Sequence, residues 1–299
     1  PAGAGCGPRG IRGSREVSPR AGGVLGTGAA LVTFVALAAG GCAPALREPP
    51  PVATLGGGRV PPPGAGAFAA ELLVQAEESF GRRPDVGQVE SARELFLAAS
   101  RADETGVAGL LGAARATAWL IEHEKDGARR AALATEAVQA CQWCQRRAPK
   151  NVECTYRLAL ALGQQARERP TTANDALPRI VALLEEVAEA EPRLDSAGAH
   201  RVLALTLLRA PGWPAGPGDA DAGLDHARRA DALVPRHPDN LLVLGEALAK
   251  TGDMEGAYRA YERAETLARA REKTGDPDAA EWATSASAAR AALSPRQRP

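Results

Sequence analysis

The chain has 299 residues, with 36 basic and 36 acidic side chains and an aromatic content of only 4%. It contains no Lys- or Arg-rich block, so it lacks the positive surface that nucleic-acid binding requires. Ala, Leu, Arg and Glu are abundant while Ile, Phe and Tyr are few, a composition that favours helices over strands.

The first 41 residues have the organisation of an export signal. Four arginines ending at Arg20 accompany a single acidic residue, Glu16, which gives this part a net charge of +3. A mostly apolar run follows over 24–39. The run has the length of a signal h-region and is shorter than the roughly 20 residues that span a bilayer comfortably. We therefore predict a signal peptide over 1–41.

Small residues lead directly to a cysteine in Ala39-Gly40-Gly41-Cys42. This run resembles the lipobox of bacterial lipoproteins, although Ala39 stands where Leu is preferred. The resemblance implies that Cys42 becomes the acylated N-terminus, and the alternatives are an uncleaved membrane anchor or an ordinary signal peptide. Several acyl chains hold a protein stably on a membrane. Ala43, where an Asp would retain the protein at the inner membrane, implies by the same resemblance an outer-membrane lipoprotein that faces the periplasm.

The segment after Cys42 is rich in proline and glycine, with Pro49-Pro50-Pro51, Gly56-Gly57-Gly58 and Pro61-Pro62-Pro63. Such a composition favours extended polyproline II, and we expect this segment to bury no apolar surface. We predict that 42–66 comprises the lipidated cysteine and a tether, and that 67–299 forms the folded domain.

Equal spacing of three prolines indicates an internal repeat. Pro149, Pro192 and Pro235 each follow a helix-like stretch, and successive members are 43 residues apart. Two helices and two turns fit into this period, so the pattern predicts stacked helical hairpins. A four-helix bundle with coincidental prolines is the alternative.

The last repeat identifies the type of hairpin. Gly245 is followed 12 residues later by Ala257, then by Tyr261 and Ala264 at spacings of 4 and 3. This is similar to the tetratricopeptide repeat, in which a small residue on the first helix lets the second helix approach closely. Thr251-Gly252-Asp253 supplies a left-handed turn and the cap of the next helix.

Earlier repeats place small or apolar residues at the same second-helix positions, counted back from each proline. These are Gly223, Ala227 and Ala230; Ile180, Leu184 and Val187; Ala137, Cys141 and Cys144; and Ala92, Phe96 and Ala99, the last set pairing with a helix at about 67–80. The period exceeds the usual 34 residues, and we expect the excess in long connections at 167–175 and 210–219. A helix over 278–293 should cap the stack. The predicted fold is an all-α solenoid of tetratricopeptide-like hairpins with a C-terminal capping helix.

Cys141 and Cys144 form a C-x-x-C motif, which in a thioredoxin-like setting indicates redox chemistry. No strand precedes this motif, and a zinc site would have to recruit Cys154 and the distant His123. Two other interpretations therefore stay open. The cysteines are small core residues, or Cys154 forms a disulfide with Cys144 or with Cys141 across the turn at Pro149, which an oxidising periplasm permits.

The sequence offers no convincing catalytic, metal or cofactor site. His200-Arg201 opens a helix, where a histidine is usually solvated or locally bonded, and Glu185, Glu186 and Glu189 form a solvated acidic face. The strongest candidate is the Pro/Gly-rich loop 210–219 with Pro211, Trp213 and Pro214. An exposed aromatic on a stiff loop is a good anchor for a protein partner, while a tryptophan folded back over the helix pair is the alternative.

Two stretches, 199–224 and 240–248, resemble the T-component of tripartite ATP-independent periplasmic (TRAP) transporters. They contain Ala199-His200-Arg201-Val202-Leu203-Ala204-Leu205, Gly216-Pro217-Gly218-Asp219 and Asn240-Leu241-Leu242-Val243-Leu244-Gly245-Glu246. The resemblance covers about 68–293 and is strongest over 195–293. It implies a helical periplasmic lipoprotein that associates with the transporter's solute-binding protein and forms homo-oligomers.

The leading interpretation is thus a non-enzymatic, lipid-anchored scaffold that docks a TRAP solute-binding protein. One alternative is a generic repeat adaptor in an envelope assembly, such as outer-membrane protein insertion or secretion. Another is an envelope redox protein that uses Cys141 and Cys144.

Overall fold

The structure, a computed structural model, describes residues 49–57 and 66–293. The predicted signal peptide, Cys42 and most of the predicted tether lie outside the described residues. Within the described ranges we find no helix that combines the length and the apolar character needed to span a bilayer.

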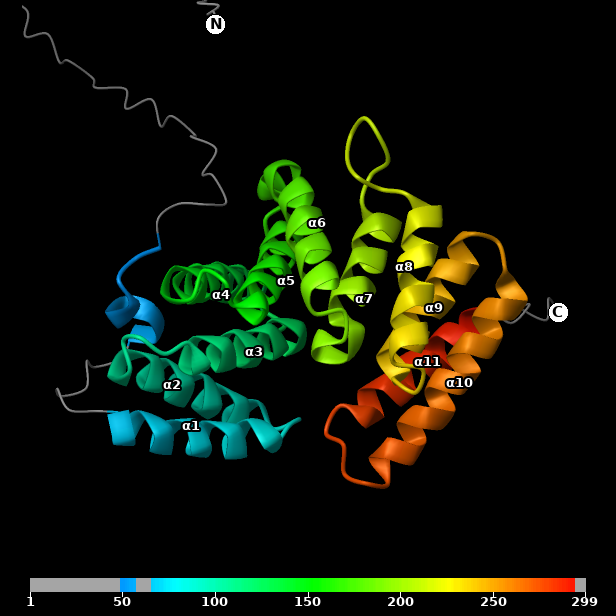
Figure 1. Cartoon of the computed structure of the whole chain (residues 1–299). Coiled ribbons are helices and arrows are strands. Elements are labelled where there is room, and N and C mark those ends of the chain that lie inside the picture. The colour runs from blue at the N-terminus through cyan, green and yellow to red at the C-terminus, as the bar shows by residue number, and fades with distance from the viewer. Residues whose placement is uncertain (1–48, 58–65, 294–299) are drawn as a thin grey trace, which may run out of the picture. The chain divides into compact units, whose positions relative to one another are not determined.

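The described chain folds as a succession of helices joined by short turns (Figure 1). They are α1 (Gly66–Gly81), α2 (Val86–Ala102), α3 (Ala108–His123), α4 (Gly127–Arg147), α5 (Val152–Glu168), α6 (Ala173–Ala190), α7 (Leu194–Arg209), α8 (Ala220–Leu233), α9 (Pro238–Lys250), α10 (Met254–Glu272) and α11 (Ala279–Leu293). Short 3-10 helices are η1 (Val52–Gly57) and η2 (Pro170–Thr172). The predicted all-α fold is confirmed.

Side chains at the helix starts explain where many of the helices begin. Asp85, Asp126, Asn151, Asp219 and Asp253 each accept a hydrogen bond from a backbone N–H in the first turn of the following helix. Such caps satisfy donors that have no partner within the helix. The sequence also predicted the turn before α10, where Gly252 adopts the left-handed conformation at φ 95°.

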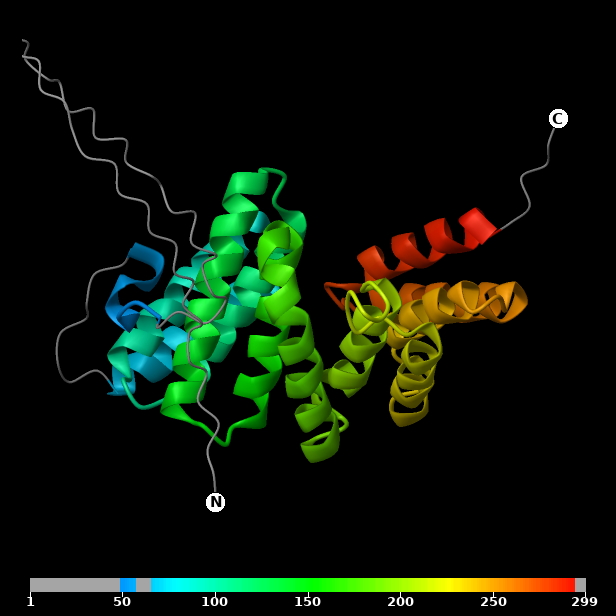
Figure 2. The same ribbon diagram turned by 90° about the horizontal axis from the view of Figure 1, so that it is seen from above.

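Each helix packs on its predecessor and its successor along the stack (Figure 2). Buried side chains form hydrophobic clusters between the helices. The odd-numbered helices α1, α3, α5, α7, α9 and α11 also contact one another in order. Even-numbered helices, by contrast, contact only their chain neighbours and the 3-10 segments among the elements that the structure describes. One helix of every hairpin therefore lines the same side of the solenoid, as stacked repeats require.

The seam predicted for the last hairpin is present. Ala257, Tyr261 and Ala264 are buried on α10, and Gly245 lies on α9 directly against the ring of Tyr261, where even a Cβ would collide with it. The final helix α11 packs on α9 and α10, with Ala286 buried among their side chains. This is the capping role predicted for a helix over 278–293.

The connection expected at 167–175 is much shorter than predicted. Helix α5 continues to Glu168 and α6 already begins at Ala173, with η2 between them. Pro170 sits at the start of η2, where a proline is tolerated because its missing N–H would have no partner there. The excess over the usual repeat length therefore lies in long helices here, with 17 residues in α5 and 18 in α6. The loop expected at 210–219 does separate α7 from α8.

One segment of the predicted tether packs on the domain. Leu55 is only 3% exposed and belongs to the first hydrophobic cluster, which is formed by residues of α1–α5. The 3-10 helix η1 contacts α2 and α4. The indole of Trp143 donates a hydrogen bond of 2.7 Å to the Pro50 carbonyl, and Arg101 donates one of 2.9 Å to that of Leu55. The expectation that this segment buries no apolar surface is wrong at Leu55. We call Pro49–Leu55 the strap.

Candidate docking groove

A groove of about 470 Å³ lies between α5, α6 and α7, with α3 at one edge. Its lining is mainly apolar and includes Ala159, Leu160, Ala166, Leu177, Val202 and Leu205. Gly163 also lines the groove, and a Cβ built on it would meet no atom within 4 Å. The missing side chain keeps this part of α5 open, so the groove can receive an apolar segment from outside.

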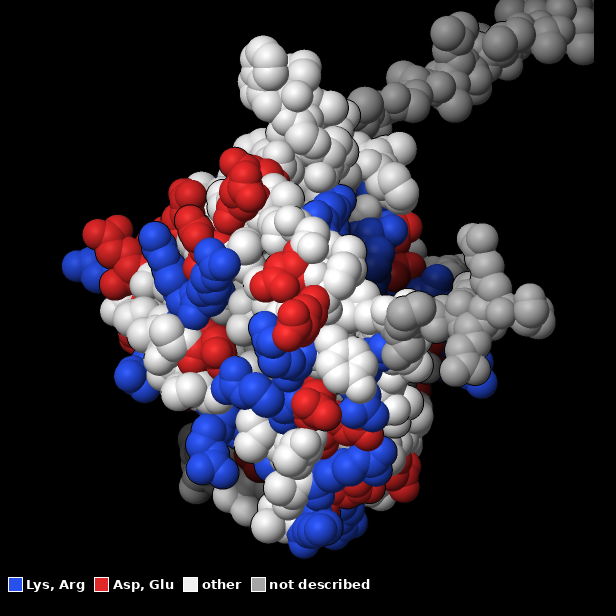
Figure 3. Space-filling model, turned by 90° about the vertical axis from the view of Figure 1, so that its right-hand side faces the viewer, with Lys and Arg blue, Asp and Glu red and all other residues white. Residues whose placement is uncertain are grey.

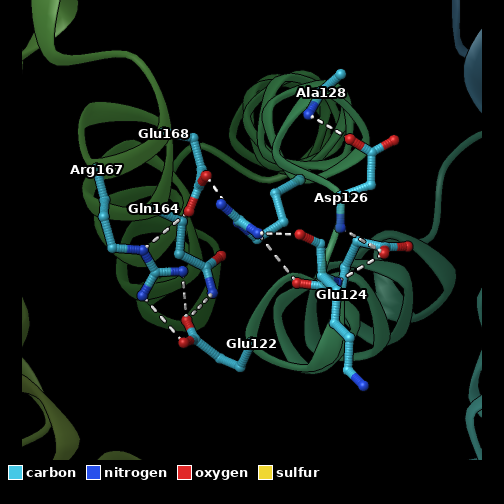
Figure 4. A network of polar contacts seen from close by, with 9 residues as sticks. Glu122, Glu124, Asp126, Ala128, Gln164, Arg167 and Glu168 are labelled. Atoms are coloured by element: carbon cyan, nitrogen blue, oxygen red, sulfur yellow. Dashed lines mark hydrogen bonds and ion pairs between the residues drawn. The ribbon is translucent and has the colours of Figure 1, made fainter.

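Charged side chains along the groove edge are paired. Arg167 forms hydrogen bonds with Glu122 and Glu168, and Gln164 donates to Glu122 as well (Figure 4). Burial acts to lower the pKa of Arg167, but its bonds to the two carboxylates outweigh this and raise it. Arg209 donates from Nε and Nη2 to the two carboxylate oxygens of Glu246, at 2.8 and 2.6 Å, and these bonds raise its pKa. The groove edge is thus polar, but its charged side chains neutralise one another, which suits a binding surface better than a catalytic one.

The loop 210–219 begins at the groove, because Ala210 and Pro211 line it. Backbone bonds close the loop on itself: Gly218 N–H donates to the Pro211 carbonyl at 2.7 Å, and Asp219 N–H to that of Leu207 at 2.9 Å. Trp213 is 90% exposed, and Pro214 is exposed beside it. The indole therefore does not fold back over the helix pair, which was the alternative interpretation.

On the face shown in Figure 3, Lys and Arg side chains alternate with Asp and Glu, and the loop rises from it as an uncharged projection. An apolar groove with an exposed tryptophan beside it has the composition of a protein-binding surface. Of the predicted site residues, Pro211 lines the groove, whereas Trp213 and Pro214 stand on the loop next to it. Sequence reasoning missed the groove itself, for which a glycine at position 163, in the middle of a helix, was the available signal.

The cysteines do not form a redox pair with each other. Cys144 is bonded to Cys154, with their Cα atoms 5.4 Å apart, and Cys141 is a free, buried thiol. Burial raises the pKa of Cys141 to about 12, so it stays protonated, whereas the thiolate is the reactive form. This arrangement fits structural cysteines, and the described residues contain no group of three or more His, Cys, Asp or Glu side chains placed to hold a metal ion.

His200 and Arg201 are both buried rather than solvated. The Nδ1 atoms of His200 and His226 lie 3.0 Å apart, so that one ring donates to the other. Arg201 pairs with Asp239 at 2.9 Å and donates to the side-chain oxygen of Asn240 at 2.9 Å. These residues connect α7, α8 and α9, and their role is structural.

Comparison with known proteins places the fold. No family model matches the chain. Among solved structures, a thermophilic TPR (tetratricopeptide repeat) protein of Thermus thermophilus superposes with a TM-score of 0.55 at 16% identity. The superposition covers 74% of this chain and 98% of that one. The fold is a TPR-like solenoid.

Two other similarities are too weak or too short to carry an argument about function. MamA from Desulfovibrio magneticus RS-1 aligns with 69% of this TPR-like chain and 98% of its own, at 19% identity and a TM-score of 0.45. A probable biofilm formation methyltransferase, WspC of Pseudomonas putida, is 45% identical over 56 residues. That match spans 19% of this chain and 13% of the methyltransferase.

Proposed function

We propose that this TPR-like protein is a non-enzymatic, lipid-anchored scaffold that faces the periplasm, holds a protein partner in the α5–α7 groove and contacts it through Trp213. The observation that carries the proposal is the combination of an open apolar groove with a tryptophan 90% exposed on the loop that starts at its edge. Large aromatic side chains that become buried on binding contribute a disproportionate share of binding energy.

The partner we propose is the solute-binding protein of a TRAP-type uptake system. Support comes from the resemblance of 199–224 and 240–248 to the T-component family, because these stretches include parts of α7, the loop and α9. Attachment through Cys42, for which the lipobox-like run is the support, would keep such a receptor close to the membrane. No enzymatic step is part of this proposal.

Gly163 allows the groove to be filled without disturbing the core. Because a side chain there meets only open space, Gly163→Phe should project into the groove, whereas Gly163→Ala should leave it open. Replacing a mid-helix glycine also removes a cost of roughly 0.5–1 kcal/mol relative to alanine. Neither change should unfold the protein.

The test measures binding of the purified TRAP solute-binding protein encoded in the same genome by calorimetry. We expect Trp213→Ala and Gly163→Phe each to weaken binding at least tenfold, about 1.4 kcal/mol, and Gly163→Ala to leave it unchanged. Val74→Ala, at an exposed apolar position on α1, is the matched control for loss of a surface side chain. Equal binding by all the variants would show that the receptor does not use the groove.

Two further outcomes bear on the finer parts of the proposal. If no TRAP receptor binds while another envelope protein is captured in a Trp213-dependent manner, the generic adaptor replaces the TRAP assignment. The anchor is tested separately, by incorporation of labelled palmitate into the wild-type protein and its loss in Cys42→Ser. A wild-type protein that takes up no label would remove lipid attachment from the proposal.

A further inference from the structure

The strap determines how much chain remains between the domain and Cys42. Pro49 is buried, Leu55 is inserted into the first hydrophobic cluster, and backbone carbonyls at Pro50 and Leu55 accept bonds from Trp143 and Arg101. These contacts hold Pro49 on the surface formed by α2 and α4. Only the seven residues from Cys42 to Glu48 are then left as a connection, and seven residues reach at most about 25 Å.

We propose that the strap makes the part of the solenoid around η1, α2 and α4 the face that contacts the lipid bilayer. The inference rests on lipid attachment at Cys42, which belongs to the proposed function. A domain connected by about 25 Å of chain cannot turn freely over a membrane. A tether released as far as the start of α1 would have 24 residues and could reach about 85 Å.

The surface beside the strap has the composition that a bilayer with anionic headgroups favours. A hollow of about 350 Å³ is lined by Pro51, Val52, Ala53, Arg101, Glu104, Trp143 and Arg147. Arg146 lies over the Trp143 ring, 5.3 Å from its centroid. Tryptophan and arginine gather where protein meets headgroups, because the ring suits the interface and the cation suits the phosphates.

The candidate groove and the Trp213 loop belong to other helices. In both ribbon views the blue strap lies beside α2 and α4, while the loop joins α7 and α8 further along the stack (Figures 1 and 2). A bilayer contact at the strap would therefore leave the groove available to a soluble partner. The strap would thus determine which face of the anchored domain points toward the membrane.

The test uses the full lipidated protein in vesicles that contain anionic phospholipid, with a photo-crosslinking residue at one position at a time. We expect lipid adducts from Glu104 and Arg146, both exposed on the domain beside the strap, and at least fivefold fewer from Trp213 and from Arg228 on α8. Leu55→Asp should release the strap, since a carboxylate cannot be accommodated in the cluster, and should make the four positions label equally. Trp143→Phe, which removes only the bond to Pro50, should have a smaller effect of the same kind.

Equal labelling at the four positions in the wild-type protein, with palmitate incorporated, would overturn the orientation and leave the anchored scaffold intact. Absence of palmitate would overturn the anchor, and the orientation with it. Circular dichroism of Leu55→Asp tests whether the helices persist in that variant. If that variant unfolds, Trp143→Phe decides: unchanged selectivity there would contradict a role for the strap.

Discussion

Two turns that occupy equivalent places in the repeat are held together in different ways. The α4–α5 turn at Pro149 is crossed by the disulfide between Cys144 and Cys154. The α6–α7 turn at Pro192 has no cysteine and is followed by Asp195, Ser196 and Ala197, all in the left-handed conformation with φ between 50° and 65°. Non-glycine residues enter this region at a cost of roughly 1–2 kcal/mol each.

A polar network holds the left-handed segment. Arg201 donates to the carbonyls of Asp195 and Ser196, and Asn240 also donates to Ser196 at 3.0 Å. The Tyr156 hydroxyl donates to the Asp195 carboxylate at 2.7 Å, and burial, followed by the charge of Asp195, raises the pKa of Tyr156. One turn thus depends on a covalent bond between neighbouring helices, the other on side chains from α5, α7 and α9.

A single substitution in the polar network should lower the free energy of unfolding more than loss of the disulfide does. Arg201 is only 8% exposed and neutralises Asp239 and Asp195. Removing Arg201 takes the donor away from the buried side-chain oxygen of Asn240 and from the carbonyls of Asp195 and Ser196. At roughly 1–3 kcal/mol for each acceptor left without a partner, the loss should total about 3–5 kcal/mol. We expect Arg201→Ala to lower the free energy of unfolding by this amount in urea titrations.

Arg228→Ala is the control for Arg201→Ala, because Arg228 forms an exposed pair with Asp225. Exposed pairs contribute little, so its effect should stay within about 0.5 kcal/mol. Equal losses in the two variants would contradict the assignment of the network as the support of the α6–α7 turn.

The disulfide should come second in size. It joins residues separated by 10 positions, and closing a loop of this length stabilises a fold by about 2–3 kcal/mol. We expect Cys154→Ser to lose this stability and dithiothreitol to have no further effect on that variant. The melting temperature with and without reductant is the measurement.

Cys141→Ala controls for the loss of a buried thiol near the disulfide. That variant should respond to reductant as the wild-type protein does, since Cys141 is not bonded. An unchanged melting temperature of the wild-type protein on reduction would show that the α4–α5 turn does not depend on the bridge.

The two turns also show what could be read from the sequence. The 43-residue period and the Gly245–Tyr261 seam were predicted because they depend on residues close in sequence within a repeating unit. The role of Arg201 was not, because its partner Asn240 lies 39 positions away. Beside a histidine at a helix start, Arg201 looked like a surface residue.

The candidate site was predictable in the same uneven way. Proline and glycine around Trp213 mark a loop by local chemistry, and the loop is there. The groove needs α5, α6 and α7 in register, and the strap needs Leu55 to reach a cluster formed by α1–α5. Contacts of this range leave no periodic trace in a single sequence.

A third experiment tests how much stability depends on the close approach of the two helices within a hairpin, at Gly245 on α9 and Tyr261 on α10. Because a Cβ on Gly245 would collide with the Tyr261 ring, Gly245→Ala should cost about 1–3 kcal/mol by overpacking. In a Tyr261→Ala background the clash is gone, and the same change should become neutral or stabilising because alanine favours helix. A double-mutant cycle by urea denaturation that shows no coupling would contradict the close approach.

Acidification should have the smallest effect on the free energy of unfolding. The residues responsible are the histidine near the start of α7, His200, and its partner His226 on α8. Burial lowers the pKa of both His200 and His226, and the positive charge of Arg229 lowers each further, while Asp225 opposes this at His226. Because these histidines bind protons less readily folded than unfolded, no stability is lost well above pH 6.5, the ordinary pKa of histidine. Stability then falls as the pH drops from there toward the lowered folded values.

Urea midpoints of the wild-type protein should therefore decrease between pH 7.5 and pH 5.5, and less so in the double variant His200→Gln/His226→Gln. His237, whose pKa is lowered by burial and by Arg201, remains in that variant and keeps part of the slope. The loss of stability on reducing the Cys144–Cys154 disulfide should be the same at both pH values, since no histidine within the described residues is bonded to that turn. If reducing the disulfide cost more stability at pH 5.5 than at pH 7.5, the two turns would be energetically coupled. The distinction between a turn held by a covalent bond and a turn held by polar contacts would then no longer hold.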